Sequence, residues 1–121
     1  MIKNYNEKMT YRRLGKTDLM VSSISMGGNR IQNEGSFIDS VHKAMDFGVN
    51  FIETGIGYKN SEKIIGRALQ RCRDRIYIST KQSIENENGN FITPDIIKKN
   101  IELSLFDLKT DYIDIYNIWN I

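Results

Sequence analysis

Three side chains that could do acid–base chemistry stand at or just beyond the ends of short apolar runs. Glu53 ends the run 51–53, Tyr58 follows five residues later, and Lys81 ends the run 75–81. In parallel α/β proteins, the loops after the C-terminal ends of the strands carry the chemistry. A lysine at the end of a buried strand is costly unless it is paired, which makes Lys81 a candidate site residue. The alternative is a lysine that reaches water from the strand end.

The segment 51–66 has the pattern of a strand, a loop and an amphipathic helix. Gly55 and Gly57 give this loop the freedom to bring the carboxylate and the phenol together. Ser61 is expected to cap the helix, and Glu62 places an acid in the positive first turn. This segment is therefore predicted to be the unit around which a site is built.

The other segments predict further strands and helices of the same kind. Thr93 followed by Pro94 is typical of a helix start, and apolar residues at Ile97, Ile101, Leu105 and Leu108 give that helix one apolar stripe. In chain order we expect a hairpin at 11–25 with its turn near 15–18, strands near 24–26, 51–53, 75–81 and 112–116, a polar loop at 82–92, and helices at 36–47, from 61, and from 93 to about 108.

Several polar side chains are interpreted as structural. His42 could be a ligand or a base, but the chain has one histidine, so a partly exposed helix residue is the favoured interpretation. Cys72 falls on the apolar side of its helix and is expected to pack as a small hydrophobe. A solvated basic face is expected for the arginines of this region, namely Arg67, Arg71, Arg73 and Arg75.

The composition is ordinary for a globular domain. The chain has 121 residues, 40% hydrophobic and 26% charged, with a net charge of +2. So small a charge gives no case for nucleic acid or a membrane surface, and no run has the length of a membrane-spanning helix. One cysteine allows neither an internal disulfide nor a metal cluster. We therefore expect a cytoplasmic protein with no metal site.

The sequences of several segments resemble motifs of the aldo-keto reductases, which are NADP-dependent (β/α)8 barrels that reduce carbonyl compounds. The family signature is Asp-Thr-Ala, then Tyr after two variable residues, then Glu and an Ile-Gly pair; here it is Glu53-Thr54-Gly55, Tyr58, Ser61-Glu62 and Ile65-Gly66. The hairpin at 11–25, the strand ending in Thr80-Lys81, and the stretch from Leu103 to Tyr116 also resemble the family. The likeness extends from Tyr11 to Ile121, under half of the family fold.

The resemblance implies a fold in the α/β class. Residues 11–121 would form an N-terminal β-hairpin followed by the first four strands and three helices of the barrel, that is, a half-barrel or truncated domain. Residues 1–10 are expected to be a flexible N-terminus. A whole barrel needs about 250 residues.

The resemblance also implies an activity, NADPH-dependent carbonyl reduction by hydride transfer. By position, Tyr58 would donate the proton, Lys81 would lower the pKa of that tyrosine, and Glu53 would hold the lysine. Glu53 is one methylene longer than the family's Asp, and a displacement of about 1 Å can cost about 100-fold in rate.

Two further positions follow from the family comparison. Gly28 and Asn29 correspond to the loop where a glycine lets the cofactor approach, although two glycines at 27–28 are also compatible with a simple turn. Trp119 stands where the family has its catalytic histidine. It could offer an indole N–H donor, but a buried aromatic at the strand end is the favoured interpretation.

A half-barrel implies open edges and an exposed apolar patch, expected at Ile113, Ile115, Ile118, Trp119 and Ile121. Two copies could close a barrel as a homodimer. We therefore expect either an impaired reductase of a small carbonyl substrate or, alternatively, a non-catalytic fragment that acts through self-association or a protein partner. In the family the remaining strands supply most of the cofactor contacts, so NADPH binding is in question.

Overall fold

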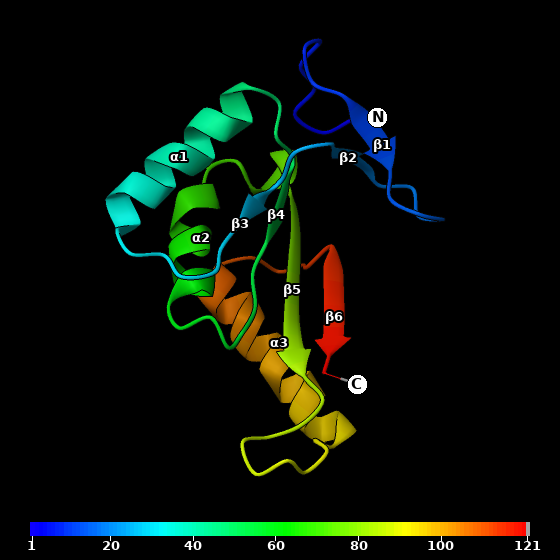
Figure 1. The fold of residues 1–121 in the computed structure, drawn as a ribbon, viewed down its shortest axis with the longest axis vertical. Helices are drawn as coiled ribbons and strands as arrows, with labels where there is room; N and C mark the ends of the chain where they lie inside the picture. The colour runs from blue at the N-terminus through cyan, green and yellow to red at the C-terminus, as the bar shows by residue number, and fades with distance from the viewer. Residues whose placement is uncertain (121) are drawn as a thin grey trace.

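A four-stranded parallel sheet forms the centre of the molecule, with three helices on one face and a small hairpin at one end (Figure 1). The computed structural model describes residues 1–120. The hairpin pairs β1 (Tyr11–Arg13) with β2 (Met20–Ser22), and the sheet has the order β3 (Met26–Gly27), β4 (Phe51–Glu53), β5 (Tyr77–Ser83) and β6 (Ile115–Trp119). The helices are α1 (Glu34–Asp46), α2 (Ser61–Leu69) and α3 (Pro94–Leu108), with a short 3₁₀ turn, η1 (Arg73–Arg75). This is the predicted order of a hairpin, four parallel strands and three helices.

The core lies between the sheet and the helices. Ile52 in the middle of β4 and Ile78 near the start of β5 are fully buried, and they belong to one core cluster with Ile65 and Leu69 of α2. Cys72 packs against this cluster, as its place on the apolar side of the helix predicted. The core thus fixes β4, β5 and α2 relative to one another, which are the elements that carry the candidate chemistry.

The helix starts agree only partly with the sequence predictions. The Thr93 side chain accepts a hydrogen bond from the Ile96 N–H at the start of α3, as predicted. The predicted cap of α2 is wrong: Asn60 is the capping position, and Ser61 is the first helical residue. The Ser61 hydroxyl instead lies 2.7 Å from Thr54 Oγ1. The Ser61 side chain therefore links α2 to the end of β4 rather than capping the N-terminus of the helix.

Glu62 lies in the first turn of α2, as predicted, and its carboxylate is buried. Its Oε1 accepts hydrogen bonds from Thr80 Oγ1 at 2.6 Å and Ser104 Oγ at 2.9 Å. Burial raises the pKa of Glu62, and these two hydrogen bonds only partly oppose the rise. On α3 the buried residues are polar Ser104 and apolar Leu108, the last residue of the predicted apolar stripe. The other three residues of that stripe are half-buried, namely Ile97, Ile101 and Leu105.

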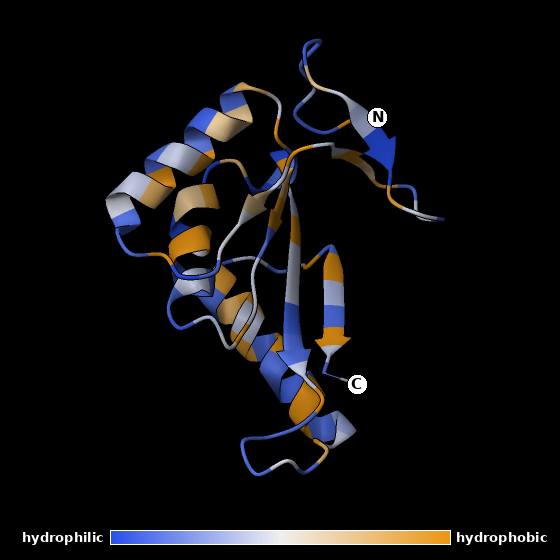
Figure 2. Ribbon diagram, in the orientation of Figure 1, coloured by the Kyte–Doolittle hydropathy of each residue, from blue (hydrophilic) through white to orange (hydrophobic). Residues whose placement is uncertain are grey.

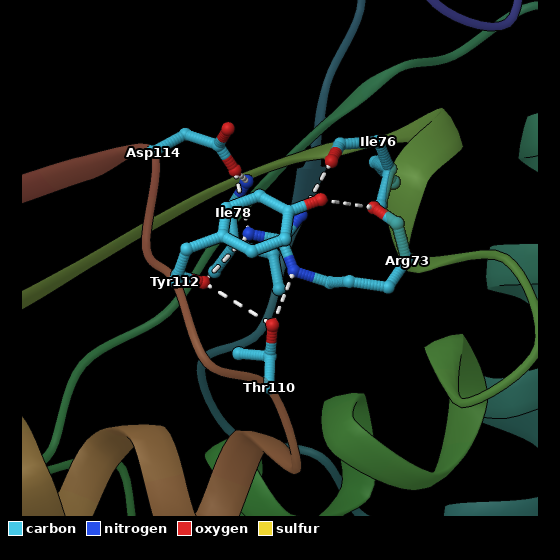
Figure 3. Close-up of polar contacts among 6 residues, drawn as sticks. All are labelled: Arg73, Ile76, Ile78, Thr110, Tyr112 and Asp114. Carbon is cyan, nitrogen blue, oxygen red and sulfur yellow. Dashed lines mark hydrogen bonds and ion pairs between the residues drawn. The ribbon is translucent and has the colours of Figure 1, made fainter.

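The expectation of a solvated basic face is wrong for Arg73. Its guanidinium is largely enclosed, donates to Asp114 Oδ2 at 2.7 Å, and stacks 3.9 Å from the centre of the Tyr112 ring (Figure 3). It also donates to the carbonyl oxygens of Ile76 and Tyr112 and to Thr110 Oγ1. Asp114 accepts a second bond from the Ile78 N–H at 2.9 Å. This cluster joins η1 and β5 to the segment that leads into β6.

Residues 1–10 pack against the end of the sheet where β4 and β5 begin. Asn4 Nδ2 donates to the carbonyl oxygens of Met45 and Val49 at 2.7 and 2.9 Å, and the Lys3 ammonium lies 4.9 Å from the centre of the Tyr77 ring. The segment therefore makes defined contacts, while the domain boundary at residue 10 stays a prediction.

Both edge strands of the described sheet, β3 and β6, have one unpaired side. Among residues 1–120, β6 pairs with β5 alone, and Figure 2 shows hydrophobic residues in this edge strand. Ile118 is 39% exposed and Trp119 is 49% exposed, whereas Ile113 packs against the core; Ile121 lies outside the described residues. Within the part of the chain that is described, no helix has the length and apolar character needed to cross a membrane.

Candidate active site

Lys81 contacts both of the other candidate site residues, Glu53 and Tyr58. Its ammonium group forms an ion pair with Glu53 Oε2 and donates to the Thr54 carbonyl oxygen at 2.9 Å. The same nitrogen lies 4.4 Å from the centre of the Tyr58 ring. Glu53, Tyr58 and Lys81, which the sequence placed at separate strand ends, therefore form one cluster.

The backbone holds the Tyr58 loop against the end of β5. The Ile56 N–H donates to the Lys81 carbonyl oxygen at 3.0 Å, and the Tyr58 N–H donates to the Gly55 carbonyl oxygen at 3.0 Å. A Cβ at position 55 would lie 3.2 Å from Lys81 Cγ and 3.6 Å from the Tyr58 ring. The glycine therefore lets the lysine stem and the phenol pass close to the loop.

The electrostatics keep Lys81 charged. Burial alone would lower the pKa of Lys81, but interactions with Glu53 and Tyr58 outweigh it and raise that pKa above its ordinary value. An ammonium group held between a carboxylate and a phenol remains protonated at neutral pH. The cluster thus presents a fixed positive charge beside the tyrosine.

The two predicted cofactor-binding residues have different surroundings. Gly28 is buried, and a Cβ there would lie 2.6 Å from Ser61 Oγ and 2.9 Å from Ile65 Cδ1. The protein itself therefore requires a glycine at 28, because α2 packs against it. Asn29 is exposed and lines a cavity of about 680 Å³ together with Arg30 and Tyr58.

Trp119 lies at the C-terminal end of β6 and is half exposed, in contrast to the buried aromatic that was the favoured interpretation. It lines a second cavity, of about 660 Å³, together with Tyr58 and Lys81. The structure therefore brings Trp119 to the same cavity as the tyrosine and the lysine.

Three contributors to this site were missed by the sequence analysis. The Thr54 carbonyl oxygen binds Lys81, and no side-chain pattern signals a backbone acceptor. Gln82 and Asn100 line the second cavity, but Gln82 was assigned to the loop because the strand was predicted to end at Lys81. Residues 79–83 are all polar, so no alternation of apolar and polar residues signalled that the strand continues to Ser83.

Comparison with known proteins agrees with this geometry. The sequence model described as "Aldo/keto reductase family" matches residues 23–120. The oxidoreductase YqkF of Bacillus subtilis (strain 168), described as uncharacterized, is 31% identical over 91% of this chain and 39% of its own length. The structure of aldo-keto reductase AKR11C1 from Bacillus halodurans, in its holo form, superposes with a TM-score of 0.80 at 30% identity, covering 91% of this chain and 40% of that one.

A second similar structure shares the fold at lower identity. It is an aldo-keto reductase from Klebsiella pneumoniae in complex with NADPH, with a TM-score of 0.68 at 23% identity, covering 81% of this chain and 35% of that protein. The chain thus spans roughly two-fifths of the relatives it matches. This agrees with the expected match to part of a barrel.

Proposed function

Because this chain belongs to the aldo/keto reductase family, we propose that its site reduces a small carbonyl compound, with Tyr58 as the proton donor. The observation that carries the proposal is the position of the Lys81 ammonium, between the Glu53 carboxylate and the face of the Tyr58 ring. A tyrosine set beside a fixed cation is suited to release a proton, because the cation stabilises the phenolate that remains.

Each residue has a separate task in this proposal. Tyr58 gives its hydroxyl proton to the oxygen of the carbonyl as negative charge develops there. Glu53 is a positioning residue, since it holds the ammonium of Lys81. Trp119 lines the same cavity and offers a hydrogen-bond donor without an acceptor, so it could orient the carbonyl but could not exchange a proton.

The residues present fit one end of a nicotinamide cofactor. Asn29, Arg30 and Tyr58 line one cavity, with the cationic Arg30 at its border; these residues would hold the end nearest the tyrosine. Gly28 contributes packing rather than space for a ligand. NADPH, when bound, supplies the hydride, and the Klebsiella relative was solved with NADPH. We expect weak cofactor binding and slow turnover, because the chain spans only about two-fifths of the length of the relatives it matches.

A substitution series tests the proposal. NADPH binding is measured by calorimetry, and reduction of a panel of aldehydes is followed by loss of NADPH absorbance. Tyr58→Phe should lower kcat by about 100-fold or more, the usual contribution of a general acid, with a much smaller change in NADPH affinity because the phenyl ring still lines the cavity. Tyr5→Phe is the matched control, because Tyr5 is exposed and stacks on Tyr11 in the N-terminal segment. Activity retained in Tyr58→Phe would reject the assigned role.

We also propose a second function for the open edge, namely self-association. It is favoured by the unpaired edge of β6 and by the exposure of Ile118 and Trp119 on it. A homodimer that pairs β6 of each copy with β3 of the other would cover this edge. Light scattering over a range of concentrations tests this function. A monomer at every concentration argues against it.

A further inference from the structure

A group of buried polar side chains lies behind the loop that carries Tyr58. Its members come from β5, from α3 and from the two ends of that loop, and each is at most 3% exposed, namely Thr54, Ser61, Glu62, Thr80 and Ser104. Buried hydroxyl and carboxylate groups are kept in folded proteins where they are hydrogen-bonded. None of these side chains takes part in the proton transfer proposed above, so their task is a separate one.

The loop that carries Tyr58 is attached to the sheet unevenly. In its first half, the Ile56 N–H donates to the Lys81 carbonyl oxygen at 3.0 Å. From Tyr58 onward, the Ser61 N–H donates to the Tyr58 carbonyl oxygen at 2.9 Å, and among residues 1–120 no backbone hydrogen bond joins this second half to the sheet. The place of Tyr58 therefore depends on where the first turn of α2 is held.

Two side-chain contacts hold that first turn. Ser61 Oγ lies 2.7 Å from Thr54 Oγ1, which closes the base of the loop. Glu62 Oε1 accepts a hydrogen bond from Thr80 Oγ1 at 2.6 Å, which fastens α2 to β5. Thr80 precedes Lys81 in β5, and their side chains point to opposite faces of the sheet. One hydrogen bond thus joins the helix that follows the proton donor to the strand that carries the cation.

The same carboxylate oxygen has a second donor on another element. Ser104 Oγ donates to Glu62 Oε1 at 2.9 Å, and this bond joins α2 to α3 on the helical face of the sheet (Figure 1). Thr80 and Ser104 are both fully buried and share one acceptor. Loss of either hydroxyl should therefore lower stability, but only the Thr80 bond fixes the loop relative to β5.

We propose that Glu62 is a positioning residue for Tyr58, and that it acts through Thr80 to set the separation between the phenol ring and the Lys81 ammonium. That separation is 4.4 Å from the nitrogen to the ring centre. A displacement of about 1 Å at a reacting group can cost about 100-fold in rate. The effect on the rate rests on the proposed reductase function, whereas the effect on the geometry does not.

The first test compares variants that remove one hydroxyl each from the same acceptor. Thr80→Val and Ser104→Ala should both lower the urea concentration at the midpoint of unfolding. Only Thr80→Val should also lower kcat, by about tenfold with little change in KM. Glu62→Gln keeps an oxygen that accepts from Thr80 and should retain kcat, whereas Glu62→Leu should lower it as Thr80→Val does. Equal kcat values for Thr80→Val and Ser104→Ala would overturn the positioning role.

The second test needs no turnover. Protons above the face of an aromatic ring resonate at lower frequency, so the Lys81 ε-methylene protons report their distance from the Tyr58 ring. The full chain is labelled with ¹³C at lysine, and the Lys81 signal is assigned by its absence in Lys81→Arg. Thr80→Val should move this signal toward its position in Tyr58→Leu, and Ser104→Ala should leave it in place.

The outcomes of this NMR test separate the two proposals. Equal positions of the Lys81 signal in Thr80→Val and Ser104→Ala would refute the positioning role even if the chain reduces aldehydes. Movement confined to Thr80→Val in a chain without reductase activity would support the positioning of the Tyr58 ring and reject the reductase function.

Discussion

Removal of the Arg73 side chain should destabilise the fold more than any other single charge deletion on η1. The guanidinium makes four hydrogen bonds to separate groups, and its side chain is 13% exposed beside an Asp114 carboxylate that is 10% exposed. Arg73→Met keeps much of the apolar stem but removes the charge and every donor. The change therefore measures the contribution of the polar contacts in Figure 3 to stability, separately from the loss of apolar packing.

The magnitude follows from what the deletion leaves behind. Removing one partner of a buried ion pair costs about 3–5 kcal/mol, because the other charge stays enclosed without compensation. Asp114 would keep its hydrogen bond from the Ile78 N–H, which favours the lower end of that range. We expect the free energy of unfolding to fall by about 3 kcal/mol, a large part of the roughly 5–15 kcal/mol of a typical domain.

The assay is equilibrium unfolding in urea followed by far-ultraviolet circular dichroism. Arg71→Met is the matched control, since Arg71 is exposed two residues earlier, and it should change the free energy of unfolding by less than about 0.5 kcal/mol. The loss of unfolding free energy in Arg73→Lys should lie between the losses in Arg73→Met and Arg71→Met, because an ammonium group keeps the charge but not the planar set of guanidinium donors. Equal losses for Arg73→Met and Arg71→Met would refute the role of the cluster.

Two further predictions concern α2. Burial raises the pKa of Glu62 above its ordinary value of 4.5, so its contribution to stability is fully present below about pH 4.5 and is lost as the pH rises through the raised value. Urea unfolding at several pH values should therefore show the wild type losing stability relative to Glu62→Gln as the pH increases, and a constant difference would contradict this. Gly66→Ala should lower the free energy of unfolding by about 2–3 kcal/mol, because the new Cβ would lie 2.6 Å from the Asp107 carbonyl oxygen. The comparison is made by thermal unfolding, and Gly57→Ala is the control because no atom lies within 4 Å of a Cβ at that position. Similar melting temperatures for Gly66→Ala and Gly57→Ala would show that α3 shifts to accept the new Cβ, and would contradict the prediction.

Local patterns were enough to predict the order of the elements. The hairpin at 11–25, the Thr93-Pro94 start of α3 and the strand that carries Lys81 follow from turn residues, capping chemistry and β-branched runs, and the structure has all of them. Each of these signals acts over a few residues. The family resemblance then allowed Glu53, Tyr58 and Lys81 to be assigned to one site.

Long-range polar pairing could not be predicted in the same way. Arg73 meets Asp114 across 41 positions of sequence, and Glu62 meets Ser104 across 42. The local pattern therefore assigned Arg73 to a solvated face and gave no sign that Glu62 is buried. Ser61 shows the same limit, since a cap and a tertiary hydrogen bond to Thr54 need the same hydroxyl. The Gln82–Asn100 pair was missed because strand length depends on pairing with β6.

Trp119 provides an intrinsic fluorescence probe of the end of β6 and of the second cavity. It is the only tryptophan among the aromatic residues of the chain, so tryptophan emission arises wholly from the end of β6. The indole is half exposed in the cavity that Tyr58 and Gln82 also line. A ligand that enters this cavity would displace water from the ring and shift the emission to shorter wavelength. Detachment of β6 would shift it to longer wavelength, which separates the two events in one spectrum.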